Sequence, residues 1–136
     1  MSTLIIDPDQ PISSLQKQFT NLFPYLKIEC FNSVHQKTEG SAKRKMHHPE
    51  THLRSCMHGN KYGSMSISPV MSVAQLEEHF KKEFGLNIQV FRKSGKLWLE
   101  TTATDFWTLL QQNDEGRSTV EEIKQEIESA DDHDIY

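Results

Sequence analysis

The residue types best suited to chemistry are four histidines and a cysteine near the middle of the chain. His47, His48, His52, Cys56 and His58 fall within a span of twelve residues. If this segment were helical, His48, His52 and Cys56 would lie four apart on one face, and zinc accepts imidazole and thiolate in tetrahedral geometry. No paired Cys-x-x-Cys motif is present and the spacing matches no standard zinc finger. A solvated polar loop is therefore the competing interpretation, and no resident cofactor is expected.

Aromatic and basic side chains indicate a second candidate site, one for binding. It joins three aromatic residues on predicted strands to three cations of a neighbouring loop: Phe31, Phe91, Trp98, Lys43, Arg44 and Lys45. Flat rings beside cations suit a protein partner, including a second copy of the chain, and they also suit single-stranded nucleic acid. The Gly-Phe core typical of RNA-recognition sheets is absent from residues 64–68, and the net charge is −4. A protein partner is therefore favoured over nucleic acid.

No arrangement of residues supports nucleophilic catalysis. Ser72 and Ser118 each precede a predicted helix and are explained as N-terminal caps. Neither cysteine has a neighbour in the sequence that would activate it. No catalytic residue is predicted, and an enzyme that uses the histidine-rich loop is the alternative class.

The clearest secondary structure lies in residues 64–101. Ser72 and Gln75 form a capping box for a helix that ends at Gly85, and its apolar residues recur three or four apart. A strand with alternating apolar residues follows. Ser94 and Gly95 are predicted to form a two-residue hairpin turn, which would place Phe91 directly opposite Trp98.

The first third of the chain repeats this pattern. The apolar residues of an earlier helix match those of the later one at an offset of 61: Leu15, Phe19 and Phe23 against Leu76, Phe80 and Phe84. Two strand-helix-strand units predict a ferredoxin-like α+β fold, a double βαβ with one antiparallel sheet and an extra C-terminal hairpin strand. Both helices would then pack on one face of that sheet. Phe31, Phe91 and Trp98 would lie on the other, open face.

Two further segments complete the predicted organisation. Residues 32–63 form a long basic and histidine-rich connection, expected to be mobile apart from a helical turn or two within 49–57. After the hairpin, Thr104 is predicted to cap a helix that stops at 113–116, and Ser118 with Glu121 to open another. The interpretation is one α+β domain over 1–116, followed by an acidic helix and tail over 117–136. These C-terminal helices are the nearest elements that could cover the open face.

Composition bounds the class of protein. The chain has 136 residues, enough for one domain with a single core. Charge is uneven, because residues 35–63 hold six basic against two acidic residues, whereas residues 114–136 hold two basic against nine acidic. No run approaches the roughly 20 apolar residues that span a bilayer, and two cysteines do not make a disulfide framework. A cytoplasmic protein that makes no use of membranes is expected.

Residues 85–116, GLNIQVFRKSGKLWLETTATDFWTLLQQNDEG, carry a resemblance to known sequences. The string from Gln89 to Glu100, the Thr-Asp pair before the next helix, Trp107, and the pair Gln112 and Asn113 resemble the C-terminal signature of a family of small uncharacterised bacterial proteins. The resemblance implies a cytosolic bacterial protein and brings no active site with it. The sequence as a whole favours a non-catalytic protein-interaction module.

Overall fold

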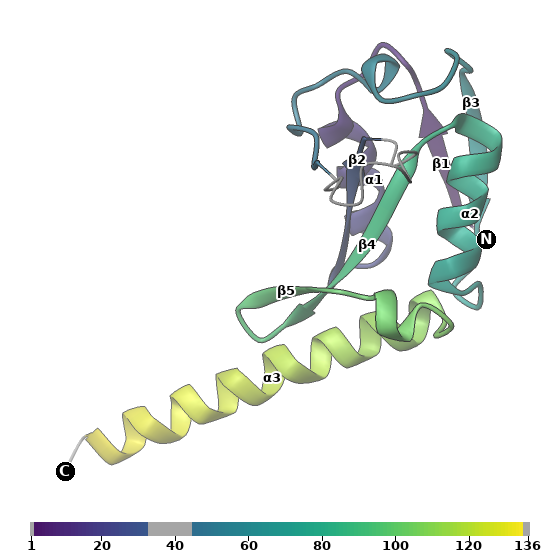
Figure 1. Cartoon of the computed structure of the whole chain (residues 1–136). Coiled ribbons are helices and arrows are strands. Elements are labelled where there is room, and N and C mark those ends of the chain that lie inside the picture. The colour runs from purple at the N-terminus through teal and green to yellow at the C-terminus, as the bar shows by residue number, and fades with distance from the viewer. Residues whose placement is uncertain (1, 33–44, 135–136) are drawn as a thin grey trace, which may run out of the picture.

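The structure, a computed structural model, describes residues 2–32 and 45–134, with side chains up to residue 130. It is a mixed α+β fold with two antiparallel sheets and three α-helices in its described part (Figure 1). The elements follow in chain order: β1 (Ser2–Ile6), α1 (Ile12–Leu22), β2 (Leu26–Phe31), η1 (Leu53–Ser55), β3 (Gly63–Ile67), α2 (Val73–Phe84), β4 (Asn87–Ser94), β5 (Leu97–Glu100), η2 (Thr102–Thr104) and α3 (Leu109–Asp134). Here η denotes a 3₁₀ turn.

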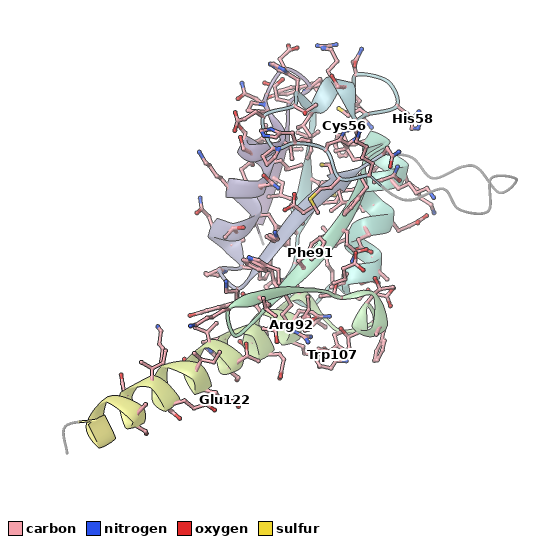
Figure 2. The ribbon with its side chains drawn as sticks, turned by 60° about the vertical axis from the view of Figure 1, so that its left-hand side comes forward. Cys56, His58, Phe91, Arg92, Trp107 and Glu122 are labelled. Carbon is pink, nitrogen blue, oxygen red and sulfur yellow. The ribbon has the colours of Figure 1, made fainter. Side chains whose placement is uncertain are left out.

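The strands form two separate ladders where the sequence predicts a single ferredoxin-like sheet. β1 pairs with β3, and β2 pairs with β4, which in turn pairs with β5, all antiparallel. Each strand-helix-strand unit therefore crosses from one ladder to the other through its helix. In consequence α1 lies along the edge of β2 and α2 along the edge of β4, at opposite edges of that strand pair (Figure 2).

The two halves of the chain are arranged as an approximate two-fold pair. Leu4 lies opposite Met65, an offset of 61 residues. Glu29 lies opposite Gln89, an offset of 60. Positions that correspond in the sequence repeat thus face each other across both ladders, as they do around a two-fold axis. The repeat predicted from the apolar spacing is consistent with this arrangement.

The core lies between the two ladders and the two helices. The residues that carry the repeat, Leu15, Phe19, Leu76 and Phe80, are all fully buried. The ends of α2 are those expected from the sequence. Ser72 and Gln75 exchange backbone and side-chain hydrogen bonds, and Gly85 ends the helix at φ 62°.

The β4–β5 hairpin differs from prediction in its register. Ser94 pairs with Leu97, so the two-residue turn is Gly95 and Lys96. Gly95 has φ 60°, and a glycine at the first central position is typical of a type II′ hairpin turn. Trp98 consequently lies opposite Lys93 instead of Phe91. Because the shift is two residues, Phe91 and Trp98 still share one face.

The C-terminal region contains one long helix where two shorter ones are predicted. Thr104 belongs to η2, and the capping box of α3 is formed by Thr108 and Gln111. Gly116 lies inside α3 instead of ending it, and a Cβ there would come within 2.9 Å of the Cβ of Tyr25. Glycine thus permits a close approach of α3 to Tyr25, which precedes β2. The helix continues through Ser118, which therefore opens no new helix.

The described part of the long connection has a defined course. Backbone amides of Ile12 and Ser13 donate to the carbonyls of Thr51 and Pro49, and Leu53 is buried. Only the three residues of η1 are helical within 45–62. The short helical turn expected within 49–57 is present as η1, and the predicted mobility of the connection stays a prediction.

Candidate partner-binding face

The outward-pointing residues of β2, β4 and β5 form what is called here the outer sheet face. It consists of alternate residues of the three strands: Lys27, Glu29, Phe31, Asn87, Gln89, Phe91, Lys93, Trp98 and Glu100. The rings of Phe31 and Phe91 stack with centroids 6.5 Å apart and planes 26° apart. The three aromatic residues predicted to share a face therefore do so.

Two lysines hold the aromatic rings of this face in place. Lys27 Nζ lies 5.3 Å from the ring centroid of Phe91 and 5.1 Å from that of Trp98. Lys93 Nζ lies 4.9 Å from the Trp98 ring. Such cation–π contacts contribute about 0.5–1 kcal/mol at exposed sites. Sequence reasoning missed both lysines, although their positions in the alternating pattern place them on the same face as Phe91.

Two buried polar residues lie beneath these contacts. Glu29 forms an ion pair with Lys27 at 3.0 Å, and its carboxylate accepts a hydrogen bond from the Gln16 side chain at 2.9 Å. Gln89, directly opposite Glu29, donates to the Val90 carbonyl at 3.1 Å. Because α1 supplies Gln16, the orientation of Lys27 depends on the packing of the first half of the chain.

Only some residues of the outer sheet face are accessible to a partner. Phe31 and Phe91 are 7% and 9% exposed. Trp98 and Lys93 are half-buried, and Met46, which bridges to Phe31, is 45% exposed. A partner would therefore contact Trp98, the lysines and Met46 more than the two phenylalanines.

The contacts of α3 lie on the opposite face of the hairpin. Arg92, whose side chain points away from Phe91 and Lys93, donates to Gln112 at 2.8 Å and stacks on Trp107 at 5.4 Å. Figure 2 shows Arg92 and Trp107 together beside α3. The helix thus covers the inner side of the hairpin and not Trp98. The sequence alone did not decide which of the two faces the C-terminal helix covers.

Of the predicted basic residues, only Lys45 is among those described. Lys43 and Arg44 lie outside the described residues. Lys45 is exposed, and its backbone amide and carbonyl pair with Asn32 at 2.7 and 2.9 Å. This pairing brings Lys45 to the end of β2, next to Phe31.

The histidine-rich segment does not form the helical face on which a zinc site depends. His48 Nδ1 accepts from the amide of Glu50, which closes a local turn, and His52 precedes the 3₁₀ turn. His48 and His52 are exposed, whereas Cys56 packs against the core. Among the described residues, no three histidine, cysteine or acidic side chains come together as metal ligands.

Both cysteines are free thiols in unreactive surroundings. Burial raises the pKa of Cys30 far above its ordinary value of 9.0, and the neighbouring Cys56 and Glu29 raise it further. Burial also raises the pKa of Cys56. Thiolate, the reactive form, is therefore disfavoured at both positions.

This burial predicts a loss of stability in alkaline solution. Above pH 9 the unfolded chain releases the Cys30 proton while the folded chain keeps it, so the free energy of unfolding falls by up to about 1.4 kcal/mol per pH unit. Below pH 9 the thiol makes no such contribution. Urea denaturation at pH 8, 9 and 10 measures the slope. Cys30→Ala should start less stable but show a shallower decline, and an unchanged slope would contradict the assignment.

A polar cleft of about 430 Å³ lies between α2 and the first half of β4. Glu77, Glu78, Lys81 and Asp105 contribute its charged groups. Glu77 accepts a hydrogen bond from the amide of Val90 at 3.0 Å, at a point of β4 that β5 does not reach. This contact gives Glu77 a structural role. The sequence repeat could have indicated this role, because Glu77 corresponds at an offset of 61 to Gln16, whose side chain bonds the backbone of β2.

Comparisons with known proteins return no relatives. No family model matches the chain, and neither a curated protein nor a solved structure matches it. The resemblance of residues 85–116 to small bacterial proteins therefore stays a prediction. None of the described helices combines the length and the apolar character needed to cross a membrane.

Proposed function

We propose that the protein is a non-catalytic protein-interaction module that binds its partner through the outer sheet face. The observation that carries the proposal is the position of Lys27, whose ammonium group lies within 5.3 Å of the rings of both Phe91 and Trp98. A partly exposed tryptophan costs little entropy to bind when neighbouring groups already restrict it. Tryptophan is also among the residues that most often dominate protein interfaces.

The charge of the face indicates the chemistry of the partner. Lys27 and Lys93 lie over the Trp98 ring. Lys96 is exposed in the adjoining turn, and Lys45 lies at the far end of β2. Glu29 and Glu100 offset only part of this positive charge. A partner segment with carboxylates around an apolar side chain would complement both the lysines and the ring.

Nucleic acid is supported less well by the same contacts. Stacking a base requires a ring face that is free of other groups. The Trp98 ring already has two ammonium groups within 5.1 Å, and Phe31 and Phe91 are less than a tenth exposed. Titration of the tryptophan fluorescence with single-stranded RNA at low and moderate salt tests this alternative, and saturable binding at moderate salt would favour it.

Two observations bear on where the module acts. Cys30 and Cys56 are both free thiols, which supports a reducing cytoplasm as the location. The resemblance of the C-terminal string supports a bacterial source. Among the described residues of the long connection, Asn32 lines the α2–β4 cleft, and none of them forms a metal-ligand cluster there, so an enzyme that uses that connection has less support.

The proposal predicts that Trp98→Ala removes partner binding. Affinity capture from a cell extract, quantified by mass spectrometry, should recover the specific partner with Trp98→Ala at less than about a tenth of the wild-type yield. The matched control is Phe106→Ala, because Phe106 is 72% exposed and lies outside the outer sheet face. Phe106→Ala should retain the partner. Equal recovery with both variants, each with a wild-type melting curve, would contradict the proposed function.

A further inference from the structure

The second half of α3 has no support from the rest of the described chain. Thr119 still contacts the hairpin, accepting from the amide of Gly95 at 3.0 Å and donating to the Lys93 carbonyl at 3.2 Å. Ile123 approaches Gly95 of the hairpin, and residues 124–130 beyond it are all exposed. Figure 1 shows the helix continuing well beyond the body of the protein. Isolated helical segments of this length are marginal in water.

This projecting half is amphipathic and acidic. Val120, Ile123, Ile127 and Ala130 are three or four residues apart and so form one stripe, with Ile127 48% exposed. The flanking charges are Glu121, Glu122, Glu126 and Glu128 against Lys124 alone. None of these five side chains forms an ion pair with another described residue. An apolar stripe bordered by unpaired carboxylates fits a surface that offers apolar groups and cations.

The protein itself has such a surface. The outer sheet face presents Trp98 as a partly accessible apolar group and Lys27 and Lys93 as cations. Exposed Met46 pairs with Phe31 at one end of the face, and exposed Lys96 lies in the turn at the other. Like charges argue against two projecting halves that pack directly on each other. A helix of one copy on the outer sheet face of another instead pairs opposite charges and covers both apolar surfaces.

We propose that the protein forms a dimer in which the projecting half of α3 from each copy lies across the outer sheet face of the other. This inference rests on the proposed function and names the partner of the same site as a second copy. Reciprocal exchange is favoured for two reasons. A stable interface buries about 1,200–2,000 Å², which one short helical segment supplies less readily than two. A one-way contact would also continue into open chains instead of closing.

Sedimentation equilibrium of the full-length chain tests the proposal through matched charge reversals. The wild type should show a mass of twice 15.8 kDa, with an affinity that weakens as salt is raised. The double variant Lys93→Glu with Lys96→Glu, and separately Glu122→Lys with Glu126→Lys, should each weaken dimerisation by at least about tenfold. An equimolar mixture of the two should recover the dimer, because each face then meets a helix of opposite charge.

A single reversal away from both surfaces provides the control. Glu50 is exposed in the 45–62 segment, and Glu50→Lys should leave the dimer unchanged. A monomer at every concentration, a dimer that survives both reversals, or assemblies larger than a dimer would each overturn the inference. Its failure is distinguishable from that of the proposed function. If the chain is monomeric while Trp98→Ala still loses a captured protein, the outer sheet face binds another protein and only the second copy is excluded.

Discussion

Phe80→Ala is expected to lower the free energy of unfolding by about 3–5 kcal/mol, and Phe19→Ala by a similar amount. Both rings are fully buried, and they occupy corresponding positions in α1 and α2. Each substitution removes apolar contacts and leaves a cavity that the surrounding helices and ladders fill only partly. Urea denaturation followed by circular dichroism measures both changes. Similar losses would show that the two halves contribute equally to one core.

Phe106→Ala is the control for these two losses. Phe106 is 72% exposed, so its removal should change the free energy of unfolding by less than about 0.5 kcal/mol. A loss below about 1 kcal/mol at Phe19 with a large loss at Phe80 would contradict the symmetric core. In one cooperative core, replacing a fully buried phenylalanine by alanine lowers the free energy of unfolding by several kcal/mol at either position.

Local features of the fold were predictable because they depend on neighbours in sequence. The capping box at Ser72 and the left-handed Gly85 define the ends of α2 within a few residues, and tertiary contacts do not change them. The outward orientation of Phe31, Phe91 and Trp98 follows from alternation along each strand. A hairpin register that is wrong by two residues preserves that orientation, which is why the candidate face was found despite the turn being misplaced.

The division into two ladders was not predictable from these patterns. An alternating strand has the same sequence pattern whichever strand it joins, so β1 and β2 look alike whether they share a sheet or not. Pairing of Leu4 with Met65 and of Glu29 with Gln89 is a long-range property. The ferredoxin-like expectation therefore rested on the commonest topology for two such units, and the chain adopts a different one.

The sequence pattern located the aromatic residues of one sheet face but not the lysines beside them. The cations predicted from the basic loop include Lys43 and Arg44, which lie outside the described residues, whereas Lys27 and Lys93 contact the rings. Both lysines follow the same alternation that located Phe91. The zinc hypothesis required a helix through His48, and the hydrogen bond of its imidazole with the Glu50 amide stabilises a turn there instead.

Gly116→Ala is expected to destabilise the protein by about 1–3 kcal/mol, opposite in sign to the usual effect of this change. At an exposed position inside a helix, alanine is more favourable than glycine by about 1 kcal/mol. Here the new Cβ would lie 2.9 Å from the Cβ of Tyr25 and 3.1 Å from its carbonyl oxygen. The backbone of Tyr25 cannot move aside freely, because its amide donates to Asn113 of α3 at 2.9 Å.

Ser118→Ala separates this steric effect from helix propensity. Ser118 is exposed in the same helix, so alanine there should leave stability unchanged or raise it by up to about 0.5 kcal/mol. Thermal and urea denaturation of both variants give the comparison. Stabilisation by Gly116→Ala would mean that α3 does not approach Tyr25. The same approach anchors the first half of α3. Without it, the direction in which the second half projects toward a second copy would no longer be fixed.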